Sequence, residues 1–156
     1  MPLLNVTTPI PASSNPRPPA SWPLNILYAD DMPELRRLMR HMLALDGHTM
    51  EGVADGQAAL ARVTEAFASF NLIITDHHMP GVDGLELVWH VRKLPFAGKV
   101  VVFSSELSPE VNDRYRQLGV DLILAKPIFP SVFRQELRQL FGHGQPDHPL
   151  PAGAGQ

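Results

Sequence analysis

Short apolar runs alternate along the chain with segments whose apolar residues recur at helical spacing. The runs are four to six residues long, which is typical of strands buried on both faces of a sheet. The helical segments begin near Pro, Asp or Ser and end near Gly or Pro. This alternation predicts βαβ units, and hence a parallel sheet with helices on both faces. The predicted strands are 25–29, 48–53, 72–75, 99–103 and 121–125, and the predicted helices are 33–45, 57–63, 85–94, 109–118 and 129–141.

The first predicted helix has one apolar face. Its apolar residues recur at intervals of three and four, so they are expected to line the side that packs on the sheet. Pro33 suits the first turn of this helix, and Gly47 suits the position just after its end. The expected buried face consists of Leu35, Leu38, Met39, Met42 and Leu43.

Proline marks the ends of the folded part. The chain has 156 residues and 16 prolines, and seven of these lie in the first 23 residues. Residues 1–24 are therefore expected to form a disordered or polyproline-like tail, and residues 142–156 a second, flexible tail. The remaining segment, 25–141, is long enough to form one hydrophobic core.

Composition excludes several functional classes. A net charge of −3 and a pI near 6.1 give no basic surface for nucleic acid. The chain has no cysteine, so it has neither a disulfide framework nor a thiolate metal site. No apolar run approaches the roughly 18 residues of a membrane span, and no secretory signal is evident. We therefore expect a cytoplasmic protein that binds neither membranes nor nucleic acid.

Polar side chains follow four of the five predicted strands. Asp30 and Asp31 follow the first strand, Asp76 the third, Ser104 the fourth and Lys126 the fifth. Because parallel strands all end at the same edge of a sheet, these residues are expected to meet there, where open α/β sheets place their ligands. The sequence pattern alone predicts this convergence.

The chemistry of such a cluster points to phosphoryl groups. Neighbouring carboxylates repel one another, and a hard cation such as Mg²⁺ (or Mn²⁺) relieves the repulsion. A Lys ammonium and a Ser hydroxyl are suited to an anion. An Asp carboxylate can itself be the nucleophile that accepts a phosphoryl group, while the cation, the ammonium and backbone N–H groups stabilise the transferring charge.

The motifs at these strand ends resemble those of a known family. They are the acidic pair Asp30-Asp31, the block DHHMPGVDG at 76–84, Ser104, and Lys126-Pro127. Over 25–141 the chain resembles a response-regulator receiver domain of the CheY-like superfamily. The resemblance implies a doubly wound (βα)5 flavodoxin-like α/β fold, with a five-stranded parallel sheet in the order 2-1-3-4-5 flanked by five helices.

The resemblance also implies a metal site and a phosphoacceptor. Asp76 would be the phosphorylated aspartate. Asp31 would bind Mg²⁺ directly and Asp30 through a water molecule. The backbone carbonyl of His78 would be the third protein ligand.

Other positions would act on the phosphoryl group by the same resemblance. Lys126 would pair with its oxygens, and Ser104 would hydrogen-bond to it and move toward it on activation. His78 and Glu106 would flank the path of the water that hydrolyses it. Receivers usually have an aromatic switch residue three positions before the Lys, whereas this chain has Ile123. We therefore expect switching to depend on Ser104 and the loop that follows it.

The function implied is that of a single-domain response regulator of a two-component phosphorelay. The chain ends soon after the last predicted helix, so we expect a stand-alone domain without an attached output domain. It would not be an enzyme in the ordinary sense, but a phosphoacceptor that assists its own phosphoryl transfer and autodephosphorylation. Its partners would be a sensor histidine kinase or histidine phosphotransfer protein and a downstream protein target, and it would be a monomer or weak homodimer.

Alternatives remain open at this point. The chain could be a phosphorylation-independent receiver-like interaction module, or a small phosphohydrolase with an Asp nucleophile. Such hydrolases usually have a second acid two residues after the nucleophile, where this chain has His78. His77 and His78 are interpreted as exposed loop residues rather than imidazole metal ligands, since adjacent residues of a turn seldom bind one ion. Asp83 and Glu86 are expected to cap and charge the start of the third helix.

Overall fold

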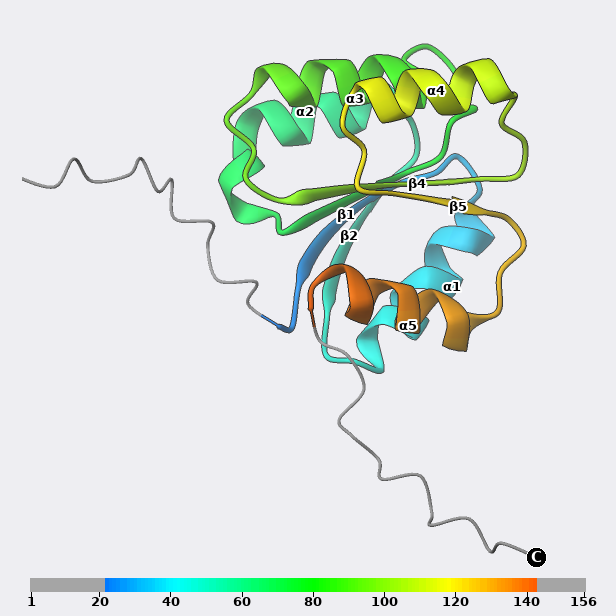
Figure 1. The fold of residues 1–156 in the computed structure, drawn as a ribbon. Helices are drawn as coiled ribbons and strands as arrows, with labels where there is room; N and C mark the ends of the chain where they lie inside the picture. Colours follow the sequence, from blue (N-terminus) through cyan, green and yellow to red (C-terminus); the bar gives the residue numbers. More distant parts are fainter. Residues whose placement is uncertain (1–21, 143–156) are drawn as a thin grey trace, which may run out of the picture.

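A single parallel sheet with helices on both faces forms the fold in the computed structural model, which describes residues 22–142. The strand order is β2-β1-β3-β4-β5, as the resemblance implied. Helices α2, α3 and α4 cover one face of the sheet, and α1 and α5 cover the other (Figure 1). The strands are β1 (Asn25–Ala29), β2 (Thr49–Val53), β3 (Leu72–Thr75), β4 (Lys99–Ser104) and β5 (Leu122–Ala125), and the helices are α1 (Pro33–Ala44), α2 (Gly56–Ala66), the 3₁₀ helix η1 (Phe67–Ser69), α3 (Gly84–Lys93), α4 (Pro109–Gln117) and α5 (Pro130–Leu140).

The sheet separates two apolar layers. Successive strand residues point to opposite faces, so the central strands contribute to both layers. Leu27 and Ile73 pack under α2, α3 and α4, whereas Ile26 and Ile74 pack against α1 and α5. All four residues of β3 are buried, as predicted for a central strand. Its carboxyl end is therefore held rigidly from both sides.

Capping residues begin several helices where the sequence predicted them. The side chains of Asp55, Asp83 and Ser108 each accept a hydrogen bond from a backbone N–H in the first turn of α2, α3 and α4. A proline occupies the first turn of α1, α4 and α5. The prediction that Asp83 caps the third helix is confirmed, because its Oδ1 lies 2.9 Å from the backbone N of Glu86.

Several details of the predicted pattern are wrong, among them the end of the second helix, which runs to Ala66 and not to residue 63. Leu38, which was assigned to the buried face of the first helix, is 53% exposed. The surface of α1 that contacts the sheet is narrower than the stripe of apolar residues along the helix. The predicted second strand starts one residue late in the structure, at Thr49. His48 instead turns its ring inward, and its Nδ1 accepts a hydrogen bond of 2.8 Å from the backbone N–H of Leu24.

An ion-pair cluster fastens α1 to α5. Asp46, just after α1, accepts hydrogen bonds from Arg134 at 2.8 and 2.6 Å and from Arg138 at 2.6 Å. The hydrogen bond to Arg134 is the largest cause that lowers the pKa of Asp46 to about 2, against the opposing effect of burial. This cluster ties together the two helices on one face of the sheet.

The predicted tails lie mostly outside the described residues, although Leu24 is buried in the core and Trp22 packs beside it. Trp22 also contacts the His48 ring edge-on, with centroids 4.3 Å apart. Within residues 22–142, no helix is both long and apolar enough to cross a membrane.

Candidate functional site

Three carboxylates converge at the carboxyl edge of the sheet. Asp30 follows β1 and Asp76 follows the adjacent β3, and one oxygen of each lies within 4.8 Å of the other and of an Asp31 oxygen. The strands hold the two inner carboxylates, since the Asp76 backbone N–H donates to the Ala29 carbonyl at 2.9 Å. Asp30 and Asp76 are buried, whereas Asp31 is exposed. The predicted convergence of these acids is confirmed.

Lys126 neutralises part of this charge. Its Nζ lies 2.6 Å from Asp30 Oδ2 and 3.2 Å from Asp76 Oδ2. Its side chain is only 13% exposed and crosses the end of β4, where Nζ lies 5.3 Å from the centre of the Phe103 ring. A buried carboxylate is costly unless it is paired, so one ammonium serves two acids here. Lys126 is thus close enough to contact any group that attaches to Asp76.

Tyr28 is a site residue that the sequence reasoning missed. Its hydroxyl donates to Asp30 Oδ2 at 2.7 Å, while Asp30 Oδ1 accepts from the Met32 backbone N–H at 2.9 Å. Burial and then the nearby Asp30 raise the pKa of Tyr28 far above its usual value, so it stays a neutral donor. The signal was present in the sequence, because residues two apart in a strand share a face.

The two histidines differ, and the prediction that both are exposed is wrong for His77. The His77 ring is buried, and its Nδ1 lies 2.6 Å from the Tyr115 hydroxyl. The His77 backbone N–H donates to Asp76 Oδ1 at 2.7 Å. Burial, and then the neighbouring His78, lower the pKa of His77, so the neutral ring is favoured. His78 is exposed as predicted, and the metal-ligand role of its carbonyl stays a prediction.

The hydroxyl and switch positions also lie near this edge. Ser104 ends β4 and is buried, and its Oγ has no hydrogen-bond partner among the described residues. Buried hydroxyls are usually paired, so this one is suited to an arriving acceptor oxygen. Ile123 pairs with Val102 in the sheet and packs half-buried against the layer under α4. Glu106 is exposed in the loop after β4.

The phosphoacceptor candidate lies beside an open cleft of about 450 Å³. Asp31, His77, His78 and Asp83 are among the residues that line it. The donor set offered to a cation consists of carboxylate oxygens, which suits Mg²⁺ or Mn²⁺ far better than a soft metal. The residues therefore fit a small, hard divalent cation that keeps several waters. They also place a nucleophilic carboxylate beside an ammonium and a backbone N–H.

Comparisons with known proteins agree with this geometry. The chain is similar to the sensor protein EvgS of Escherichia coli O157:H7, at 34% identity over 119 residues, which are 75% of this chain and 10% of that protein. It is similar to the gliding motility regulatory protein of Myxococcus xanthus, at 33% identity over 69% of this chain and 14% of that protein. The chain thus spans a small part of these curated relatives.

A solved structure extends the likeness to three dimensions. The chemotaxis protein CheY4 of Vibrio cholerae superposes with a TM-score of 0.68 and 30% identity, covering 74% of this chain and 97% of that one. Residues 26–138 match the response regulator receiver domain as a family. Five parallel strands in the order β2-β1-β3-β4-β5, with an acidic cluster at their carboxyl ends, are consistent with both matches. The chain therefore belongs to the response regulator receiver domain family of two-component signalling.

Proposed function

We propose that the chain accepts a phosphoryl group on Asp76 in a Mg²⁺-dependent reaction, and that this modification changes its binding to a downstream protein. The donor would be a sensor histidine kinase or a histidine phosphotransfer protein. The observation that carries the proposal is the position of Asp76, between the Lys126 ammonium at 3.2 Å and the His77 backbone N–H at 2.7 Å. An Asp that only capped the turn after β3 would not need the buried Lys126 ammonium beside it.

Asp76 is suited to the role of nucleophile. An oxygen of its carboxylate would form the new bond to phosphorus as the bond from phosphorus to the donor's imidazole nitrogen breaks. That nitrogen keeps the electron pair of the broken bond. Asp30, Asp31 and the His78 carbonyl would hold the cation together with Asp76. When bound, Mg²⁺ supplies positive charge close to the phosphoryl oxygens as they approach the carboxylates.

Lys126 and Ser104 would stabilise the product. Lys126 now pairs with two carboxylates, and a phosphoryl group on Asp76 would offer it stronger acceptor oxygens. Ser104 ends the neighbouring strand with a buried hydroxyl that has no partner within residues 22–142 and could donate to the same group. When Ser104 shifts toward the phosphoryl group, it would leave space that the Ile123 side chain can fill. Because Ile123 is aliphatic, it brings no hydroxyl that would need a hydrogen-bond partner there. The switch would thus combine one hydrogen bond with aliphatic packing.

The surface that signals would be the segment that follows these residues. Residues 104–128 contain Ser104, Glu106, α4 and β5, so movement at Ser104 reaches an exposed face directly. A downstream protein would bind there, and the chain would act as a monomer or weak homodimer in the cytoplasm. Autodephosphorylation would involve a water molecule whose path His78 and Glu106 flank.

A small phosphodonor separates the candidate functions. The chain would be incubated with acetyl phosphate and Mg²⁺, while both the phosphate bound to protein and the donor consumed are measured. A switch retains about one phosphate per chain. A phosphohydrolase consumes many equivalents of donor and retains little, and an unphosphorylated interaction module does neither. Either of the last two results would overturn the proposal.

A further inference from the structure

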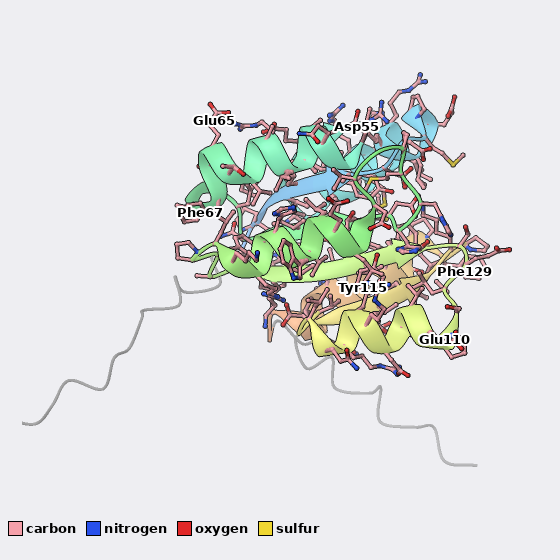
Figure 2. The ribbon with its side chains drawn as sticks, turned by 90° about the horizontal axis from the view of Figure 1, so that it is seen from above. Asp55, Glu65, Phe67, Glu110, Tyr115 and Phe129 are labelled. Atoms are coloured by element: carbon pink, nitrogen blue, oxygen red, sulfur yellow. The ribbon has the colours of Figure 1, made fainter. Side chains whose placement is uncertain are left out.

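One hydrogen bond joins the phosphoacceptor turn to α4. The His77 Nδ1 and the Tyr115 hydroxyl lie 2.6 Å apart, and their rings meet edge-on with centroids 5.5 Å apart. Both side chains are buried. Tyr115 lies on the side of α4 that faces α3 (Figure 2). The two residues are 38 positions apart in the sequence, so the contact depends on the tertiary fold.

The fold leaves room for this hydroxyl beside the phosphoacceptor. Gly84 begins α3, and a Cβ added there would clash with the Tyr115 hydroxyl oxygen and lie 2.5 Å from the Asp76 carbonyl oxygen. The Gly84 backbone N–H also donates to the His77 carbonyl at 2.9 Å. The absence of a side chain at this position thus allows Tyr115 to approach the backbone around Asp76.

His77 connects the two ends of this contact. Its backbone N–H holds Asp76 Oδ1 at 2.7 Å, and its ring is held by Tyr115. We propose that Tyr115 is a positioning residue: through His77 it fixes the N–H that holds the phosphoacceptor, and through the same contact α4 responds to phosphorylation. This inference rests on the proposed function at Asp76.

The position of α4 depends strongly on Tyr115. Helix α4 is polar along most of its length, and Tyr115 is its one buried residue. Its far end is held separately, because Arg92 of α3 donates to the Leu118 carbonyl at 2.8 Å and to the Gly119 carbonyl at 2.6 Å. Packing alone would be satisfied by a Phe, whereas a buried hydroxyl requires a partner. That partner is the residue next to Asp76.

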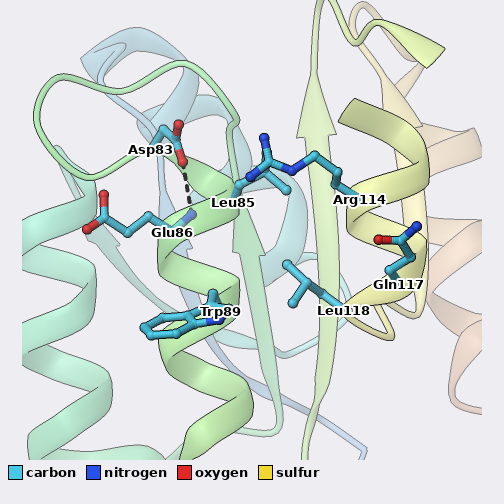
Figure 3. Close-up of a pocket in the computed structure, with 7 residues that line it drawn as sticks. All are labelled: Asp83, Leu85, Glu86, Trp89, Arg114, Gln117 and Leu118. Carbon is cyan, nitrogen blue, oxygen red and sulfur yellow. Dashed lines mark hydrogen bonds between the residues drawn. The ribbon is translucent and has the colours of Figure 1, made fainter. Parts of the chain in front are cut away.

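The contact lies next to a cleft between α3 and α4. This cleft has a volume of about 450 Å³ and is lined by Asp83, Glu86 and Trp89 from one side and by Arg114 and Leu118 from the other (Figure 3). Arg114 directly precedes Tyr115 in α4. Movement of Tyr115 would therefore change the shape of this cleft, which shares Asp83 with the cleft beside Asp76.

The test uses beryllofluoride, a stable mimic of the phosphoryl group, together with Mg²⁺. Binding would be followed by ¹⁹F NMR, and the response of α4 by hydrogen exchange of its backbone amides. We expect the wild type to bind beryllofluoride and to change its exchange rates in residues 109–117. Tyr115→Phe keeps the ring and removes the hydroxyl that holds His77, so it should bind beryllofluoride more weakly than wild type and, at saturating beryllofluoride, lose the α4 response.

Two further variants keep the test decisive. His77→Leu breaks the same contact from its other end while keeping the backbone N–H, and should lose the α4 response as well. Arg92→Met is the matched control, because it loosens α4 at the far end. It should raise exchange in both states and keep the response.

The outcomes separate this inference from the proposed function. If wild type fails to bind beryllofluoride, both are overturned. If binding occurs and Tyr115→Phe and His77→Leu show the full wild-type response in α4, the coupling alone is overturned. An α4 response lost equally in Arg92→Met would also overturn it, because general loosening of the helix would then explain the loss.

Discussion

Replacing Asp31 by Asn is expected to stabilise the protein without divalent cations and to destabilise it with them. One oxygen of Asp31 lies within 4.8 Å of an oxygen of Asp30 and of Asp76, and the ammonium of Lys126 contacts Asp30 and Asp76. Two unit charges 4.8 Å apart repel by about 0.9 kcal/mol in water and by about 3.5 kcal/mol at an effective dielectric constant of 20. Because Asp31 is exposed, the lower value is the better guide. Asp31→Asn should therefore raise the free energy of unfolding by about 1 kcal/mol in EDTA.

Mg²⁺ should make wild type more stable than Asp31→Asn, the reverse of the order expected in EDTA. A ligand that binds only the folded state adds about 1.4 kcal/mol of stability for each tenfold excess over its dissociation constant. Wild type would gain this stabilisation, whereas Asp31→Asn would lose a direct ligand and most of the gain. Their stability curves against Mg²⁺ concentration should cross.

Urea unfolding followed by circular dichroism would measure this, in EDTA and over a series of Mg²⁺ concentrations at constant ionic strength. Asp113→Asn is a matched control, since Asp113 is an exposed residue of α4 that forms a surface ion pair of 3.4 Å with Arg116. It should change the free energy of unfolding by less than about 0.5 kcal/mol in either condition. The reasoning fails if Asp31→Asn is less stable than wild type in EDTA, or if Mg²⁺ stabilises both equally.

Three further predictions concern stability and phosphoryl lifetime. The pKa of Asp46 is lowered to about 2, so its stabilisation is present above pH 4 and is lost as the pH falls toward 2. Asp46→Asn should therefore cost about 1 kcal/mol at pH 7, after discounting for the partly exposed arginines, and nothing near pH 2, as measured by urea unfolding. A constant difference across that range would contradict this. Gly84→Ala should destabilise the fold by about 1–3 kcal/mol through its clash with Tyr115, and an unchanged thermal midpoint would refute that close contact. His78→Ala should lose its phosphoryl group faster than wild type between pH 5.5 and 8, because the exposed ring shields the acyl phosphate; slower loss would assign His78 to orienting the water instead.

The sequence predicted the parts of this molecule that depend on local pattern. Periodicity and turn residues predicted the buried strand before Asp76, the cap at Ser108 and the proline after it. The rule that parallel strands end at one edge predicted that Asp30 and Lys126 lie close together. These features were predictable because each depends on a few neighbouring residues or on the topology alone.

Features that depend on tertiary packing could not be predicted in this way. Leu38 lies on the apolar stripe of α1, yet the helix meets the sheet along a narrower line, so this side chain stays exposed. His77 was expected to be exposed, because its pattern in the sequence does not indicate that its partner Tyr115 of α4 lies beside it. The hydrogen bond from Tyr28 to Asp30 could have been predicted, because alternate residues of a strand point to the same face. It was missed because an aromatic residue in a strand usually belongs to the hydrophobic core. Leu38 and His77 acquire their surroundings only when the layers of the fold are assembled.

The most direct test of the central claim is to locate the phosphate chemically. The chain would be phosphorylated with acetyl phosphate and Mg²⁺, reduced with borohydride, which converts an aspartyl phosphate to homoserine, digested and sequenced by tandem mass spectrometry. We expect homoserine at position 76 and at no other aspartate, and none in Asp76→Asn. Homoserine at Asp30 or Asp31, or an unmodified residue 76 in phosphorylated protein, would contradict the account.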